Sequence, residues 1–194
     1  MLQLWYNMGV NQTTLPIPPT LISQQNLIHD IEYAIIYYLD IGISCEHLDS
    51  QQVDNICRDA RFTSTLLQNI VPQLFSDIES MPNDNEGYDF KSKTTNEVYE
   101  MKNYTRRPSA KISKKTGKPV PSTVAMNYSA SKYQGVGRIY NETEHFAHAM
   151  KTTYILCDIV DVPIVRIRFI KGSELVKLYP NPKVGYGERQ NIFG

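Results

Sequence analysis

The amino-acid sequence predicts a single α/β domain, with a mainly helical part over residues 1–80 and a sheet core over residues 87–170. Three observations lead to this prediction. Apolar side chains recur every three or four positions in the first part, the period changes to two after turn-forming residues at 81–87, and two β-branched runs follow residue 150. Because 194 residues suffice for one core and are few for two, we assign the chain to one domain.

Helices are expected in two stretches of the first part. Residues 23–43 carry apolar side chains at helical spacing, and the serine at the start can cap this helix. Ser50 can cap a second helix over residues 51–58. A helical stripe then continues over residues 62–80, with a bend at Pro72.

A β-hairpin is expected next. Residues 88–92 and 97–104 alternate in polarity on either side of a short polar turn. If the turn centres on residues 94–95, opposed residues have numbers that sum to 189. Asp89 then lies directly across from Glu100, about 5 Å away between β-carbons.

The remainder of the chain predicts a long loop, a short helix and two strands. Residues 104–138 mix Pro, Ser, Gly and Lys with little periodicity, and a loop of this length is usually functional. Asn141 can cap a helix that runs through Met150. Residues 152–160 form an apolar run typical of a buried strand, and residues 164–170 alternate in polarity, with the two arginines expected to face solvent.

Composition excludes several classes of protein. The three cysteines are scattered and form no Cys-x-x-Cys pair, which argues against a disulfide framework and a zinc site. The start of the chain lacks the basic region of a signal peptide, and acidic residues interrupt the most apolar stretch, so we expect a cytoplasmic protein without membrane contact. The Gly135-Val136-Gly137 segment lacks a preceding strand and a third glycine, so no nucleotide cofactor is expected.

Charge is segregated along the chain although the formal net charge is zero. Residues 1–90 hold two basic side chains against twelve acidic ones, whereas residues 91–141 hold eleven basic side chains against two acidic ones. No Asp or Glu occurs between Glu100 and Glu142. This basic segment indicates a nucleic-acid partner, although a solvated loop is its more ordinary interpretation.

The hairpin carries the residues with the clearest chemistry. Side chains alternate along a strand, so Glu100 and Lys102 share one face, and Asp89 joins them from across the hairpin. Two carboxylates this close repel unless a cation lies between them, and their oxygen atoms suit Mg²⁺. The ion would polarise a phosphate and lower the pKa of a bound water, while Lys102 would orient that water. This set predicts phosphodiester hydrolysis.

The segment Gly87-Tyr88-Asp89, followed after ten residues by Glu100-Met101-Lys102, resembles the D…(D/E)xK signature of the PD-(D/E)xK nuclease superfamily, most closely its small type II restriction endonucleases. The resemblance implies a restriction-endonuclease-like core, with a mixed central β-sheet and a catalytic hairpin flanked by helices. It also implies Mg²⁺-dependent cleavage of double-stranded DNA, a homodimer, and a prokaryotic or phage origin. No proline stands immediately before Asp89, and many members of the superfamily also lack this proline. Many relatives contribute an additional carboxylate from a helix, for which Glu32 is the only match in this sequence.

The basic segment supplies the expected DNA contacts. Arg and Lys suit phosphates and guanine, whereas Asn and Gln suit adenine in the major groove. We expect the backbone to be contacted by Tyr104, Arg106, Arg107, Lys111, Lys114, Lys115 and Lys118. Base contacts are expected from Asn127, Ser129, Lys132, Gln134 and Arg138.

Several alternatives remain open. The chain can be another nuclease of the same superfamily, such as a junction resolvase or repair nickase, or a catalytically inactive DNA-binding module. The Glu100 and Lys102 pair can also be a surface salt bridge on a hairpin. His145 and His148 have a spacing compatible with two zinc ligands, but without a third ligand nearby we expect a partly exposed helix face or a phosphate contact.

Overall fold

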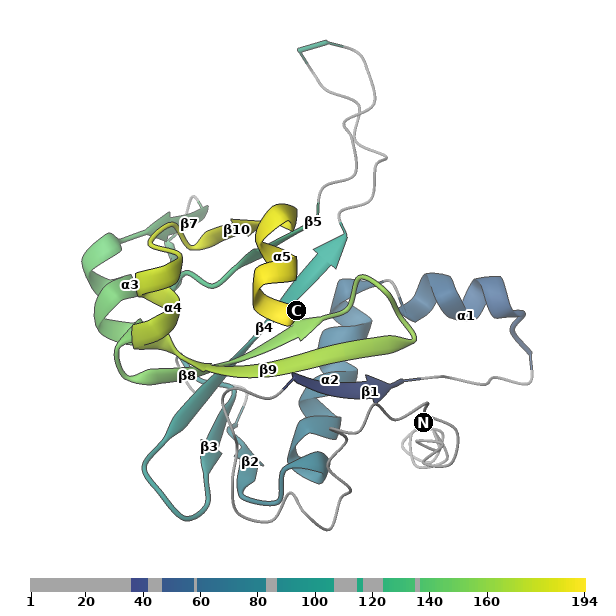
Figure 1. The fold of residues 1–194 in the computed structure, drawn as a ribbon, viewed down its shortest axis with the longest axis horizontal. Coiled ribbons are helices and arrows are strands. Elements are labelled where there is room, and N and C mark those ends of the chain that lie inside the picture. Colours follow the sequence, from purple (N-terminus) through teal and green to yellow (C-terminus); the bar gives the residue numbers. More distant parts are fainter. Residues whose placement is uncertain are drawn as a thin grey trace.

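The computed structural model describes residues 36–41, 47–57, 59–82, 87–106, 115–116, 124–134 and 137–194. In this part of the chain a curled, mixed β-sheet is flanked by helices on both faces (Figure 1). None of the described helices is long and apolar enough to cross a membrane. The mixed α/β architecture expected from the sequence is therefore confirmed at this level.

The sheet has the strand order β1-β9-β8-β4-β3-β2. These strands are β1 (Ile36–Asp40), β2 (Ile78–Ser80), β3 (Phe90–Ser92), β4 (Val98–Arg106), β8 (Thr152–Asp158) and β9 (Ile164–Lys171). β4 and β8 run parallel at the centre, and the other neighbours in this order are antiparallel. The end of β4 also pairs with β5 (Val124–Asn127), which pairs in turn with β10 (Lys183–Gly185). β6 (Ser131–Gln134) and β7 (Gly137–Tyr140) form a separate hairpin.

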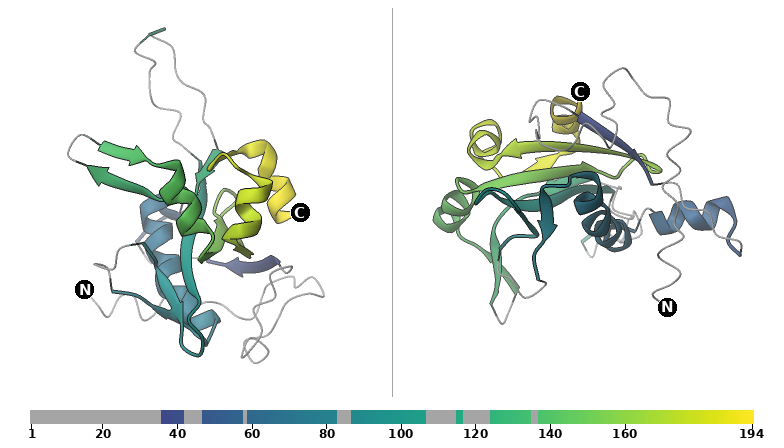
Figure 2. Two further views of the ribbon diagram at one scale, coloured as in Figure 1. Left: turned by 90° about the vertical axis from the view of Figure 1, so that its left-hand side faces the viewer. Right: turned by 90° about the horizontal axis from the view of Figure 1, so that it is seen from below.

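The two faces of the sheet are covered by different helices, as Figure 2 shows from two further directions. The helix α2 (Ala60–Leu74) packs on one face against Tyr99 and Met101 of β4. On the other face α3 (Glu142–Ala149), α4 (Gly172–Leu178) and α5 (Tyr186–Phe193) cover Tyr154 and Leu156 of β8. Strand alternation therefore turns the even-numbered residues of β4, including Glu100 and Lys102, towards the α3 side.

The N-terminal part departs from the prediction in two places. The helix expected over residues 23–43 is wrong at its end, because Ile36–Asp40 forms β1 and pairs with β9, while residues 23–35 lie outside the described residues. The helical stripe expected to residue 80 ends at Leu74, and Ile78–Ser80 forms β2. Short apolar runs suit either structure, and pairing with an existing strand decides between them.

Side chains of Asp and Asn cap the starts of α1, α2 and α3. α1 (Ser50–Cys57) is capped by Asp49 and not by Ser50, because Asp49 Oδ1 accepts the Gln52 N–H at 2.8 Å and Gln52 Oε1 accepts the Asp49 N–H at 2.9 Å. Asp59 caps α2 through its Oδ1, which accepts two backbone N–H groups. The cap expected at Asn141 is confirmed, since its Oδ1 accepts the N–H groups of Thr143 and Glu144.

The loop expected over residues 104–138 is wrong as a description of this segment. β4 continues to Arg106, and β5, β6 and half of β7 lie within the range. These strands have four residues each, too few to show an alternating pattern in the sequence. Residues 107–114 and 117–123 lie outside the described residues.

Candidate active site

The hairpin register is the one that the sequence predicts. Phe90 pairs with Tyr99 and Lys91 with Val98, so opposed residues sum to 189. Asp89 lies one residue beyond the last of these pairs, and its N–H donates to the Tyr99 carbonyl at 2.9 Å, so the ladder itself stops at Phe90 and Tyr99 and does not include the pairing expected between Asp89 and Glu100. On its other side the Asp89 carbonyl accepts the Met81 N–H at 2.9 Å. Asp89 is therefore fixed by its backbone between β4 and the segment that follows β2.

The Asp89 carboxylate lies against the middle of β4. Pairing of β3 with β4 ends at Tyr99, and pairing of β5 with β4 begins at Thr105, so the described strands leave an opening along this edge. Asp89 Oδ2 accepts the Met101 N–H in this opening at 2.7 Å. Asp89 Oδ1 accepts a hydrogen bond from Gln68 Nε2 of α2 at 3.3 Å. The side chain thus satisfies a strand N–H that would otherwise need another partner.

Glu100 precedes Met101 on β4 and is contacted from two sides. Lys102 Nζ forms an ion pair with Glu100 Oε1, as expected for neighbours on one strand face. His148 Nε2, from α3, lies 2.5 Å from Glu100 Oε2. The side chains of Glu100, His148 and Lys102 are 13%, 15% and 23% exposed. The three groups therefore form one partly buried cluster.

The pKa values of the two carboxyl groups are shifted in opposite directions. Burial raises the pKa of Asp89 above its ordinary value, the Met101 N–H and the Lys102 charge oppose this, and the charge of Glu100 adds to it. Burial also acts to raise the pKa of Glu100, but the hydrogen bond with His148 and the charge of Lys102 outweigh it, so that pKa is lowered. Glu100 therefore ionises more readily than Asp89. A further cation beside Asp89 would favour the ionised form of Asp89.

The donor set fits Mg²⁺. The described residues contain no group of three or more His, Cys, Asp or Glu side chains placed to hold a metal ion. Mg²⁺ is commonly bound by only one or two carboxylates, with water and substrate phosphate completing its shell. Asp89 and Glu100 supply that number, and Asp89 is a half-buried carboxyl group whose charged form a cation would stabilise.

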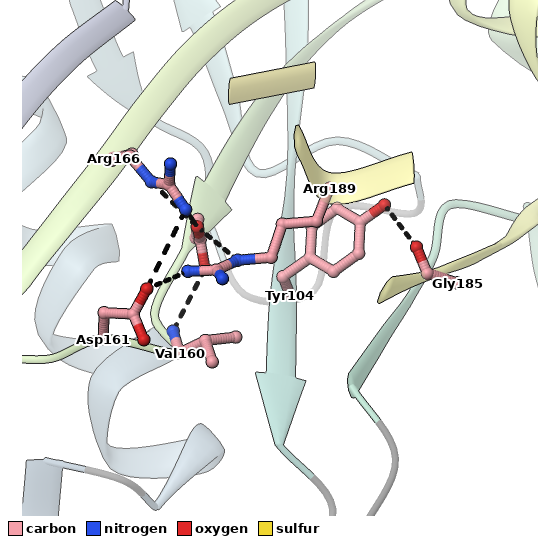
Figure 3. Close-up of polar contacts among 7 residues, drawn as sticks. Tyr104, Val160, Asp161, Arg166, Gly185 and Arg189 are labelled. Carbon is pink, nitrogen blue, oxygen red and sulfur yellow. Dashed lines mark hydrogen bonds and ion pairs between the residues drawn. The ribbon is translucent and has the colours of Figure 1, made fainter. Parts of the chain in front are cut away.

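The expected DNA contacts fare differently. The DNA contact expected from Tyr104 is wrong, because its side chain is fully buried in the core and its hydroxyl donates to the Gly185 carbonyl at 3.5 Å (Figure 3). Lys115, Asn127 and Ser129 are exposed or partly exposed, and Asn127 Oδ1 accepts the Ser129 N–H. The backbone of Arg106 ends β4, and those of Lys132, Gln134 and Arg138 lie in the β6–β7 hairpin. Outside the described residues lie Glu32, Arg107, Lys111, Lys114 and Lys118.

The partly exposed helix face expected for the two histidines of α3 is wrong for His145, which is buried, while His148 is partly exposed. His145 is 2% exposed, and its Nδ1 accepts the Ala130 N–H at 3.2 Å. His148 contacts Glu100 and stacks on Tyr88. The three-residue spacing of the two histidines is visible in the sequence. The side of the sheet that they face depends on where α3 packs, which the spacing does not show. Gln68 gave no sequence signal.

A second charged cluster holds the C-terminal helix. Asp158 is 1% exposed and pairs with Arg166 and Arg189, and Arg189 pairs also with the exposed Asp161 (Figure 3). Arg168 donates to the Ile192 carbonyl at 2.6 Å. The expectation that Arg166 and Arg168 face solvent is wrong, because α5 packs over both side chains. The Arg166 guanidinium lies over the Phe193 ring, and Arg168 donates to the Ile192 carbonyl.

Comparison with known proteins found no matching family model, no matching curated protein and no matching solved structure.

Proposed function

We propose that this chain is a Mg²⁺-dependent endonuclease that hydrolyses phosphodiester bonds of double-stranded DNA at a specific short sequence. In this proposal it is a type II restriction endonuclease of the PD-(D/E)xK superfamily. Two observations support the proposal: Glu100 and Lys102 form an ion pair on one face of β4, and the Asp89 carboxylate accepts the N–H of Met101, the residue between them.

The surrounding fold supports the same proposal. The described mixed sheet, flanked by helices, is compatible with the restriction-endonuclease-like core that this proposal requires (Figure 1). Arg106, the last residue of β4, lies four positions after Lys102 and begins a run of basic residues. A cationic segment at that place would attract the DNA backbone close to the acidic residues.

Each residue has a distinct part in the proposed reaction. Asp89 and Glu100 would hold Mg²⁺, which when bound polarises the phosphate and lowers the pKa of a water molecule. Lys102 would orient the attacking water and offset negative charge that develops on the phosphate. Gln68 would fix the Asp89 carboxylate from α2. Further parts of the proposal are a homodimer and a cytoplasmic location in a prokaryote or in a phage-infected cell.

Incubation with plasmid and phage DNA tests the function directly. Discrete fragments in Mg²⁺, absent in EDTA and carrying 5′-phosphates, would support site-specific cleavage. A smear would indicate a nonspecific nuclease, and cleavage confined to branched or mismatched DNA would indicate a resolvase or nickase. Salt-sensitive binding without cleavage would indicate an inactive DNA-binding module.

A further inference from the structure

His148 occupies one oxygen of the Glu100 carboxylate. Its Nε2 lies 2.5 Å from Oε2, while Lys102 pairs with Oε1. An ionised carboxylate can only accept hydrogen bonds, so the imidazole is the donor in this contact. Both the neutral Nε2–H tautomer and the imidazolium can donate from this nitrogen. The contact therefore does not depend on a change in the protonation of His148.

The His148 ring is held firmly in place. Tyr88 stacks on it with ring centroids 5.0 Å apart and an interplanar angle of 14°. Gly87 adopts a φ of +105°, which favours glycine, and a β-carbon there would lie 3.6 Å from His148 Cε1. The His148 carbonyl accepts the Thr152 hydroxyl at 2.7 Å, which ties the end of α3 to β8. Within the Gly87-Tyr88-Asp89 segment, Tyr88 thus supports the histidine and Asp89 supplies the carboxylate.

The other partner of Glu100 is easier to displace. Lys102 carries its ammonium on a flexible four-carbon stem, and its side chain is the most exposed of the three at 23%. A stacked and packed imidazole loses more contacts when it moves. When a cation approaches Glu100, Oε1 is therefore the oxygen that can exchange its partner, and Oε2 stays with His148.

We propose that His148 is a positioning residue of this site, which fixes Glu100 by holding Oε2 and leaves Oε1 for a divalent cation. The inference rests on the proposed function, because it assigns His148 to the same metal site. Hydrogen-bond partners of ligating carboxylates orient the ligand, and their loss commonly weakens metal affinity or activity about tenfold to a hundredfold.

Calorimetric titration of Mg²⁺ and Mn²⁺ into the full chain, without DNA, is the direct test. His148→Ala is expected to weaken cation binding at least about tenfold. His148→Gln, whose amide can donate to the same oxygen, is expected to restore most of the affinity. His47→Ala is the matched control, because His47 is exposed and precedes α1, and its affinity should equal that of the wild type. In DNA cleavage, His148→Ala should lower kcat and leave the KM for DNA nearly unchanged.

The outcomes separate the two proposals. If the wild type binds no divalent cation and cuts no DNA, the proposed function fails. If the wild type binds and cuts but His148→Ala matches it, or His148→Gln is as weak as His148→Ala, the positioning role alone is overturned. Thermal unfolding checks that each variant is folded. If His148→Ala is unfolded, Tyr88→Leu replaces it, because loss of the stacked ring should also weaken cation binding, and unchanged binding would overturn the inference.

Discussion

The carboxylate of Asp89 accepts the backbone N–H of Met101 at 2.7 Å, which joins the start of β3 to the middle of β4. This hydrogen bond lies where β3 has ceased to pair with β4 and β5 has not yet begun. The acidic side chain thereby takes the place of a strand partner and stays next to Glu100. The same gap in the sheet that needs a polar acceptor is thus the place where the proposed cation would bind.

Asp89→Asn and Lys102→Ala should each lower Mg²⁺-dependent DNA cleavage at least about a hundredfold, because the first removes a charge that would hold Mg²⁺ and the second a charge that would offset negative charge on the phosphate. Initial rates of plasmid cleavage measure this, and gel-shift titration should show DNA binding within a few-fold of the wild type. Lys91→Ala is the matched control, since Lys91 belongs to the same hairpin but is 49% exposed and pairs with Glu79. Full activity in Asp89→Asn or Lys102→Ala would rule out this site.

Gln68→Ala should reduce the cleavage rate about tenfold without abolishing it, because Gln68 orients Asp89 but carries no charge. Gln73→Ala serves as the control, since Gln73 is exposed on the same helix and donates to the Asn69 carbonyl. Rates for both variants at saturating Mg²⁺ provide the comparison. Equal rates would show that α2 has no part in positioning the carboxylate.

Protonation of His145 should destabilise the fold. Burial lowers the His145 pKa below its ordinary value of 6.5, and the neighbouring His148 acts in the same direction. The unfolded chain then binds more protons than the folded one, so the free energy of unfolding should fall as the pH drops from about 7 to about 5.5. Protonated Nδ1 could no longer accept the Ala130 N–H.

Urea unfolding across this pH range measures the effect, and His145→Leu should remove part of the slope. The carboxyl groups with lowered pKa values, such as Asp59 and Glu100, lose their contributions only at lower pH, below their ordinary values of 3.8 and 4.5. A slope that is unchanged in His145→Leu would assign the pH dependence to other groups.

Arg189→Leu should destabilise the protein by about 3 kcal/mol, because it leaves the buried Asp158 with one cation fewer. Asp161→Asn removes a partner that is 65% exposed, and it should cost at most about 1 kcal/mol. Urea unfolding of both variants at neutral pH gives the comparison. Similar losses for the two would mean that Asp158 does not depend on Arg189.

The hairpin was predictable because its information is local. The turn at residues 93–96 and the alternation on either side fix the register that pairs Phe90 with Tyr99 and Lys91 with Val98. β1 was not predictable in the same way, because Ile36–Asp40 becomes a strand through pairing with β9, more than 120 residues further along the chain. His148 reaches Glu100 for a similar reason. Its position depends on the packing of α3 over the sheet, which no local pattern encodes.

The dependence of DNA cleavage on Mg²⁺ concentration, compared between the wild type and Glu100→Gln, is the most direct measurement. Gln keeps the size of the side chain and can still accept from His148, but it removes the charge that would hold the cation. We expect saturable, Mg²⁺-dependent cleavage in the wild type and at least about a hundredfold slower cleavage in Glu100→Gln at every Mg²⁺ concentration. Equal rates in the two proteins, or wild-type cleavage that persists in EDTA, would contradict a metal-dependent nuclease site at Asp89 and Glu100.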